Sequence, residues 1–404
     1  MKIGIIGGGA SGMMAAISAK RKNPQYEVHI FERNEILGRK INATGNGRCN
    51  FTNLCFDKNF YFGEERDRIL SILEAFSPND TLDFFNDLGV LYHLKDTYAY
   101  PRSEQAATVV DAFTQELNHL GVVLHCNAAV TAVDRTKQGY CLRTEQQNFF
   151  FDKIIIASGS KANPKLSGYG DGYLFGKKLG LQIVPVLPAL VQLVVANNPL
   201  KTAAKTRCYA RVTSVIDQQE GDSHKGELQI TDYGISGILV FQISRHISKA
   251  LWEKKRASVL LDFMPEYTKE EVLRLLTKYF YHSRTTSCEN VMAGFFHRKV
   301  GKVLLKQSGI DGNKKNTTIS KKDLEVLLKN IKEMKLTITD TKGFDSAQIC
   351  QGGISLKEIN PQTMESYQYP GLYITGEVLD ADGICGGYNL QWAWATGNLA
   401  GRNV

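Results

Sequence analysis

Several features are missing from this sequence, and each absence removes a class of function. No uninterrupted apolar run approaches the ~18 residues needed to cross a bilayer, so we expect no membrane segment. The eight cysteines are scattered, with no CxxC pair and no ligand spacing, so we expect neither a metal site nor a redox-active disulfide. Reduced thiols in a cytoplasmic protein are the default for such a pattern. The remaining composition, 43% hydrophobic and 22% charged over 404 residues, is that of a globular protein.

The net charge of +8 does not by itself indicate a polyanion partner. The densest basic runs lie near 254–258 and 312–323. We interpret them as solvated surface in the middle of the chain, compatible with attraction for anionic small molecules. We therefore expect a small-molecule substrate, no nucleic-acid partner, and a monomer or homodimer.

The first 32 residues carry the clearest motif. KIGII at 2–6 has the β-branched, apolar pattern of a buried parallel strand. Gly7, Gly9 and Gly12 then satisfy G-x-G-x-x-G, a helix is predicted over 13–22, and YEVHIFE at 26–32 predicts a second strand that ends in Glu32. Although the N-terminus loosely imitates a secretory signal, the glycine spacing indicates a dinucleotide site. The pyrophosphate would lie at the helix start, and Glu32 would accept two hydrogen bonds, from both ribose hydroxyls of an adenosine.

Two later segments favour FAD over NAD. Residues 130–160 alternate between apolar and polar side chains as in an antiparallel meander, and they lead to an apolar strand that ends in Ala157-Ser158-Gly159. An ordinary turn at the end of a strand would give the same pattern at these three residues. GLYITGE at 371–377 predicts another strand, followed by Gly387-Tyr388-Asn389 at the start of a small-residue helix. Amides at that helix start would stabilise negative charge on a flavin edge. No second G-x-G-x-x-G follows a strand, so we expect no dedicated NAD(P)H domain.

The middle of the chain predicts an insertion. Short strands are expected at 190–195, 210–216, 226–232, 258–263 and 336–341, with a helical piece over 237–254. From 266 to 330 the apolar spacing is helical. The prediction is an α/β fold in which a Rossmann-type domain of the glutathione-reductase-like group (1–188 and 342–404) is split by an insertion. The insertion comprises a β-barrel-like domain (189–265 and 331–341) and a small helical subdomain (266–330). Such an insertion commonly roofs a substrate site, although a role in dimerisation alone remains the alternative.

Five motifs together resemble the BaiN/YhiN-type NAD(P)/FAD-dependent oxidoreductases, a family that also contains an aminoacetone oxidase. They are GRKINATGNGRCNFTN (38–53), YPRSEQAATVVDAF (100–113), ITDYGISG (230–237), INPQTMES (359–366) and GLYITGEVLDADGICGGYNLQWAWATG (371–397). The resemblance covers nearly the whole chain. It departs from the family at Tyr367, at Cys350-Gln351 and at Cys385, which we expect near the substrate face.

The resemblance implies a set of residues that hold non-covalent FAD. At the ADP half these are Gly7, Gly9, Ala10, Ser11, Gly12, Glu32 and Arg33, with Ala129 and Val130 at the adenine and Ala157, Ser158 and Gly159 in a nearby turn. Beside the flavin they are Arg39, Lys40, Thr44, Gly45, Asn46, Gly47, Arg48, Cys49 and Asn50, then Gly376, Glu377, Asp380, Gly387, Tyr388 and Asn389. Arg48 and Tyr388 are also the candidate catalytic residues, as an anchor for a carbonyl or anion and as a proton donor.

The function predicted from this resemblance is reduction of FAD by NAD(P)H, which binds transiently, and hydride transfer from the flavin to an acceptor. The acceptor could be an activated C=C bond, free flavin or oxygen. An FAD-dependent amine oxidase that uses oxygen is the first alternative. A flavin-dependent RNA-modifying or redox-sensing protein is the alternative of another class.

Overall fold

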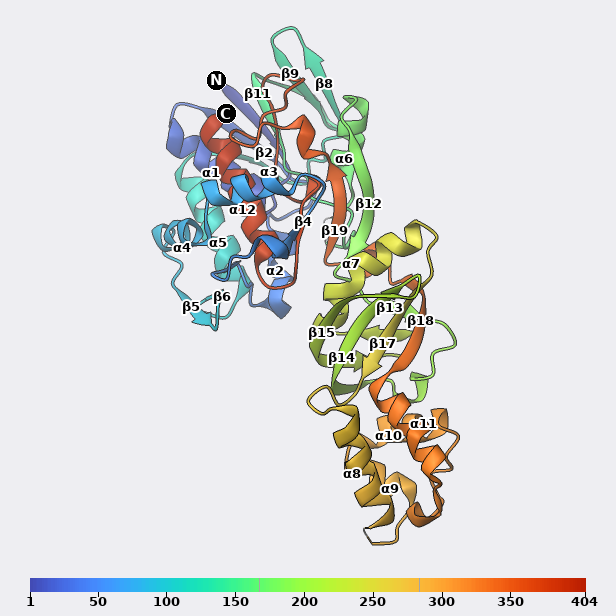
Figure 1. The fold of residues 1–404 in the computed structure, drawn as a ribbon. Helices are drawn as coiled ribbons and strands as arrows, with labels where there is room; N and C mark the ends of the chain where they lie inside the picture. The colour runs from blue at the N-terminus through green and yellow to red at the C-terminus, as the bar shows by residue number, and fades with distance from the viewer. Residues whose placement is uncertain (167, 283) are drawn as a thin grey trace. The chain divides into compact units, whose positions relative to one another are not determined.

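The computed structural model describes residues 1–166, 168–282 and 284–404 (Figure 1). The chain forms two compact units. Unit 1 comprises Met1–Leu187 and Ile349–Val404, and unit 2 comprises Pro188–Gln348. Within the described residues, every helix is too short or too polar to cross a membrane.

A five-stranded parallel sheet forms the centre of unit 1. Its order is β20 (Leu372–Ile374), β11 (Lys153–Ile156), β1 (Lys2–Ile6), β2 (Glu27–Phe31) and β7 (Val123–His125). Ile5 lies opposite Ile30 of β2 and Ile155 of β11, and all three side chains are buried. Strands buried on both faces explain the continuous β-branched runs in the sequence. The predicted Rossmann-type parallel sheet is confirmed.

Helices α1 (Ala10–Lys22) and α12 (Tyr388–Asn403) pack against each other beside this sheet (Figure 1). Their contact depends on two glycines of α12, because a Cβ at Gly397 or Gly401 would lie 2.4 or 2.3 Å from a backbone oxygen of α1. The other helices of unit 1 are α2 (Arg39–Asn42), α3 (Arg66–Ala75), α4 (Pro78–Asp87), α5 (Ala106–His119) and α6 (Asp171–Lys178).

Smaller sheets complete unit 1. The meander predicted over 130–160 is present as β8 (Ala132–Thr136), β9 (Gly139–Arg143) and β10 (Asn148–Phe151). A second antiparallel sheet has the order β3 (Thr52–Asn53), β6 (Tyr98–Pro101) and β5 (Tyr92–Lys95). Two-stranded pairs join β4 (Tyr61–Phe62) to β21 (Asp382–Gly383) and β12 (Ile183–Ala189) to β19 (Ile349–Ile354).

Unit 2 contains a closed barrel. Its strands, in order, are β13 (Leu193–Val195), β16 (Gly234–Ser236), β15 (Gln219–Ile230), β14 (Thr206–Ile216), β17 (Ala257–Asp262) and β18 (Met334–Thr341). The β14–β15 hairpin runs well beyond the predicted strands at 210–216 and 226–232, because its polar outer residues hide the strand pattern. Helix α7 (Ile238–Trp252) packs against β14 and β15.

Four helices of unit 2 come between β17 and β18 in the sequence and lie at one end of the barrel (Figure 1). They are α8 (Lys269–Tyr281), α9 (Cys288–Met292), α10 (Arg298–Gln307) and α11 (Lys321–Lys332). Helices α8 and α11 begin with capping boxes, in which Thr268 pairs with Glu271 and Ser320 pairs with Asp323. Their buried residues recur at helical spacing and share one core with the barrel.

Candidate active site

Three glycines at the start of α1 differ in whether a side chain would fit at their position. A Cβ at Gly7 would lie 2.4 Å from the oxygen of Ala157, and one at Gly12 would lie 2.0 Å from the oxygen of Gly7. Those two positions require glycine because backbone atoms cannot move aside. A Cβ at Gly9, by contrast, would meet nothing within 4 Å. The space in front of Gly9, at a helix start without a side-chain cap, is where an anion can approach the amides.

Glu32 is buried and its carboxylate is already bonded within the protein. Oε2 accepts from the Gly8 amide at 2.9 Å, and Oε1 accepts from the amide and side chain of Asn34 at 2.9 and 2.6 Å. A carboxylate has about four acceptor positions. The geometry therefore leaves about one position for a ribose hydroxyl, fewer than the two hydrogen bonds expected from the sequence.

The segment expected at the adenine end runs beside Glu32. The Ala128 amide donates to the Glu32 carbonyl at 2.9 Å, which places half-buried Ala129 and buried Val130 next to the end of β2. Arg33 forms an ion pair with Asp171, and its guanidinium lies 4.3 Å from the ring centre of Tyr169.

The polar loop at 38–53 folds into two short helical turns, α2 and the 3₁₀ turn Thr44–Gly47. Gly45, Asn46 and Gly47 all have positive φ, which explains the glycine-asparagine composition. Arg39 donates to the Asn34 side chain at 2.5 Å, and the Thr44 hydroxyl donates to the Ile41 carbonyl at 2.6 Å.

Cys49 faces the core rather than the surface of this loop. It has no exposed area, and burial raises the pKa of its thiol to about 12. A thiol with this pKa is protonated at neutral pH and is a poor nucleophile. The side-chain oxygen of the neighbouring Asn50 is buried without a hydrogen-bond partner among the described residues.

Three segments distant in sequence meet at Glu377. Lys40 of α2 donates to its carboxylate at 2.5 Å, and the Ser160 hydroxyl donates to the same oxygen at 3.0 Å. Ser160 follows the turn Ala157-Ser158-Gly159. In that turn the Ser158 hydroxyl is buried without a partner in the described part of the chain, and Gly159 has positive φ and open space around it. The structure thus brings together the loop, the turn and the Gly376-Glu377 segment.

The C-terminal segment is held by backbone contacts. Gly376 has positive φ, and a Cβ there would lie 2.5 Å from the Ser11 hydroxyl. Gly387, also with positive φ, is the N-cap residue of α12 and leaves no room for a Cβ beside Thr52. The Asn389 side chain bonds both the amide and the carbonyl of Gly383, at 2.8 and 2.9 Å.

Two further residues of this segment are also committed to protein contacts. A buried oxygen of Asp380 accepts from the Glu64 amide at 2.9 Å. The Tyr388 hydroxyl donates to the Cys55 carbonyl at 3.0 Å, and burial raises the Tyr388 pKa above its usual value. The family departures Cys350 and Cys385 lie in unit 1, with thiol pKa values raised by burial to about 11 and about 12.

Arg48 is the centre of a group that sequence analysis missed. Its guanidinium lies 3.6 Å from the Glu104 carboxylate, whose other oxygen lies 2.8 Å from His93 Nε2. The Tyr100 ring stacks on His93, with ring centres 5.9 Å apart, and lies beside Gly45. Burial raises the Tyr100 pKa, while the nearby Arg48 lowers it by a smaller amount. A sequence signal was present only as the motif at 100–113, which contains Tyr100 and Glu104.

The site fits a dinucleotide on its own geometry. Gly9 leaves room where a phosphate would lie, and neither α1 nor α12 has a side-chain cap or an acid in its first turn. Buried oxygens of Asn42, Asn50 and Ser158 lack partners among the described residues. Buried polar groups without partners cost free energy, which a ligand that hydrogen-bonds to them would recover.

Comparison with known proteins identifies the family. A family model described as the HI0933-like protein Rossmann domain matches residues 1–403. The chain belongs to the HI0933-like family. This confirms the resemblance that the five sequence motifs gave.

Relatives of this HI0933-like chain include a protein from Clostridium scindens named 3-dehydro-bile acid delta(4,6)-reductase. It is 44% identical over 99% of this chain and 98% of its own length. A protein from Escherichia coli named ribosomal RNA dihydrouridine synthase is 28% identical over 97% of this chain and 95% of its own length. With this family membership and a reductase as a relative, the HI0933-like chain is an FAD-dependent oxidoreductase.

Solved structures share the fold. A flavocytochrome c3 fumarate reductase is similar with a TM-score of 0.51 at 12% identity, covering 100% of this chain and 77% of that one. A 3-ketosteroid delta1-dehydrogenase from Sterolibacterium denitrificans gives a TM-score of 0.50 at 11% identity, covering 99% and 98%. At these identities the likeness concerns the fold alone.

Proposed function

We propose that this protein reduces a C=C bond conjugated to a carbonyl group in a small molecule, with FAD as the resident cofactor and NAD(P)H as the reductant. The observation that carries the proposal is the 44% identity, over nearly the whole of both chains, to a protein named as a delta(4,6)-reductase of a 3-dehydro-bile acid. Similarity at this level and coverage supports a shared reaction type more strongly than a shared substrate.

The protein's part is to bind and orient the cofactor. The open amides at Gly9 would face the pyrophosphate, Glu32 would accept from the ribose, and the loop from Lys40 to Asn50 would lie beside the ring with Glu377. When bound, FAD accepts a hydride from the reduced nicotinamide and passes one to the substrate. The amides at the start of α12 would stabilise negative charge at one edge of the ring.

Saturation of a conjugated C=C bond needs a polarised carbonyl and a proton for the carbon next to it. Arg48 is our candidate to bind the carbonyl oxygen, because its side chain is 54% exposed and its only described ion pair, with Glu104, is long. A guanidinium supplies hydrogen bonds to an oxygen that gains negative charge.

Two tyrosines are candidates for the proton donor. Tyr388, the residue proposed from the sequence, is buried, and its hydroxyl donates a hydrogen bond to the Cys55 carbonyl. Tyr100 is partly exposed beside Arg48, and its hydroxyl has no hydrogen-bond partner among the residues that the structure describes. A raised pKa keeps either phenol protonated at neutral pH. We therefore propose Tyr100 as the donor and Tyr388 as a residue that holds the backbone at Cys55.

A second candidate substrate is uridine in RNA. Two relatives, from Escherichia coli and Haemophilus influenzae and each 28% identical to this chain, are named ribosomal RNA dihydrouridine synthase. Dihydrouridine is uridine with the C5=C6 bond saturated, and that bond is conjugated to the C4 carbonyl. The same hydride and proton chemistry would therefore serve both candidates.

Anaerobic mixing of the FAD-loaded protein with NADH or NADPH tests the proposal. We expect the flavin absorbance to bleach, and to return on adding a steroid 4-en-3-one but not on adding buffer. Recovery with an unmodified rRNA transcript and not with the enone would favour the second candidate. Bleaching by aminoacetone but by neither nicotinamide would replace both with the amine oxidase. A colourless protein that does not take up added FAD would overturn the reading.

A further inference from the structure

The positive charge of this protein is concentrated in one structural segment. Between the first residue of α8 and the last residue of α11, Lys269–Lys332, there are 14 Lys and Arg residues and 6 Asp and Glu residues. That difference of +8 equals the net charge of the whole chain, because the remaining 35 basic and 35 acidic residues cancel. We call Lys269–Lys332 the basic segment.

Three lysines of this segment form ion pairs among the described residues. Lys269 pairs with Glu333 at 2.5 Å, Lys302 with Glu289 at 3.0 Å, and the buried Lys332 with Asp262 at 2.8 Å. Only the run near 312–323 reveals part of this grouping in the sequence, because the other lysines are spread over three helices and the loops between them. The folded segment nevertheless carries a net positive charge, which attracts polyanions.

A pocket of about 730 Å³ lies where the basic segment joins the barrel. It is lined by β14, the loop after β17, α8, α9 and the residues before α10. Tyr209, Tyr267 and Tyr279 line it with 56, 41 and 41% of their surface exposed, and Phe295 and Phe296 lie among them. Aromatic rings are normally buried, so a group of exposed rings around a hollow is suited to stacking against a flat ligand.

The rim of this pocket carries both signs of charge, with the positive sign in excess. Arg207 and Arg284 line it against one acid, Glu266, and His297 lies among the lining residues. Arg207 is also paired with Glu227 at 2.8 Å, both side chains being exposed. An exposed pair of this kind is weak and can be exchanged for a phosphate.

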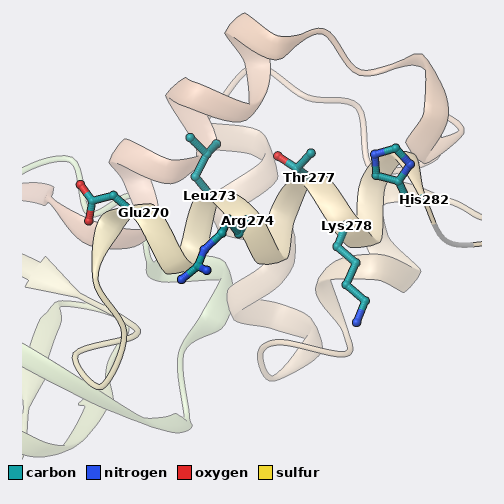
Figure 2. Close-up of a pocket in the computed structure, with 6 residues that line it drawn as sticks. All are labelled: Glu270, Leu273, Arg274, Thr277, Lys278 and His282. Atoms are coloured by element: carbon teal, nitrogen blue, oxygen red, sulfur yellow. The ribbon is translucent and has the colours of Figure 1, made fainter.

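Another face of α8 lines a second hollow, of about 450 Å³. Figure 2 shows Arg274 and Lys278 extending from α8 on the same side, with Glu270 and His282 towards the two ends of the helix. The Lys278 ammonium lies 5.5 Å from the ring centre of Tyr279, which lines the aromatic pocket. Helix α8 therefore carries cations on one face and an aromatic ring of the pocket on an adjacent one.

We propose that the basic segment binds single-stranded RNA, with bases stacked in the aromatic pocket and phosphates bound along α8. Single strands are held by a positively charged groove together with aromatic rings on which exposed bases stack. A membrane surface would use the charge but not the aromatic hollow. The proposal deepens the second candidate substrate, uridine in RNA. Because this binding site lies in unit 2, RNA binding is measured separately from the reductase activity proposed for unit 1.

Fluorescence anisotropy with the FAD-loaded full chain and a fluorescein-labelled 15-nucleotide RNA of mixed sequence tests this. We expect the dissociation constant to rise with salt, with about 0.7 log units per log unit of salt for each phosphate contacted. R274Q/K278Q should lower that slope by about 1.4. The matched pair K177Q/K178Q, which removes two exposed lysines of α6, should leave it unchanged.

The aromatic pocket is tested by Y267A/Y279A, which should weaken binding about 5- to 100-fold without changing the slope. Y267F/Y279F should retain binding because the rings remain, which separates stacking from misfolding. W252A, which removes a 55% exposed aromatic of α7 outside the pocket, is the control.

Absence of binding at 50 mM salt overturns the proposal. So does equal affinity for duplex RNA or for vesicles containing phosphatidylserine, or a loss with W252A as large as with Y267A/Y279A. The rate of flavin bleaching by NAD(P)H should be the same in all these variants, so a change there would be a failure of the enzyme rather than of the RNA site.

Discussion

Helices α1 and α12 of unit 1 begin differently from helices α8 and α11 of unit 2. In unit 2, α8 and α11 start with Thr268 and Ser320, whose side chains bond the first turn, and each has an acid there. In unit 1, α1 and α12 start with glycines, have no side-chain cap, and carry no acid in the first turn. A cap is worth about 1 kcal/mol to a helix. Unit 1 forgoes that stabilisation at two helix starts, which leaves their amides and positive dipole ends available to an anionic cofactor.

The same contrast separates the two tyrosines of the candidate active site. The Tyr388 hydroxyl is bonded to the Cys55 carbonyl, whereas that of Tyr100 has no partner among the described residues. Polar groups closed by protein partners stabilise the fold. Groups without a protein partner are the ones that can act on a ligand, and five substitutions test that division.

The largest effect is expected from Gly12→Ala. Its Cβ would lie 2.0 Å from the Gly7 oxygen, a backbone atom that cannot move aside, and 3.3 Å from the Ala157 Cβ. We expect a loss of stability above about 4 kcal/mol, seen as insoluble protein or a collapsed urea-unfolding midpoint. A soluble G12A protein that retains FAD would contradict the packing described for α1.

Tyr100→Phe should lower the rate of substrate reduction by about 10² to 10⁴, the usual contribution of a general acid, with flavin bleaching by NAD(P)H unchanged. Tyr388→Phe should instead lower the free energy of unfolding by about 1 kcal/mol and alter that rate little. Single-turnover reoxidation of the flavin measures the first effect and urea unfolding the second. If the two variants exchanged behaviours, Tyr388 would be the proton donor and the division would fail.

Gly9→Ser would convert α1 to a capped helix. Because Gly9 has φ of −84°, a serine fits its backbone, and nothing lies within 4 Å of the new Cβ. The apo-protein should keep its stability or gain a few tenths of a kcal/mol. FAD affinity, measured by quenching of flavin fluorescence, should fall about tenfold or more. The serine hydroxyl would accept hydrogen bonds from the amides at the start of α1, and its side chain would fill the space where the phosphates are expected. Unchanged affinity would place the phosphates elsewhere.

The smallest effect is expected from Thr268→Ala, which removes the α8 cap. It should lower the stability of unit 2 by about 1 kcal/mol and leave FAD affinity as it is. Hydrogen exchange of the α8 amides would report it. Weakened FAD binding in this variant would contradict the expectation that the stability of unit 2 does not affect FAD binding.

Sequence predicted the parts of unit 1 whose signals are local. The strand, glycine and helix spacing up to Glu32 and the C-terminal strand and helix appear where expected, because each depends on a period or a turn of a few residues. The group around Arg48 could not be predicted. It forms only when β5 and β6 pair and place His93 against Tyr100 near the polar loop, which is long-range packing. The hydrogen bonds that Glu32 and Tyr388 form within the protein could not be predicted either. Their partners, the Gly8 amide and the Cys55 carbonyl, are backbone groups that no sequence motif marks.

The close contact of α1 with α12 has a consequence for synthesis. These helices lie near opposite ends of the 404-residue sequence, and Gly397 and Gly401 fit directly against the backbone of α1. On the ribosome, the face of α1 that α12 covers remains without its partner until α12 emerges. Unit 2 is one contiguous segment, so all of its strands and helices are synthesised before α12. We expect nascent chains to mature in that order, with the N-terminal motif dependent on chaperones for longest.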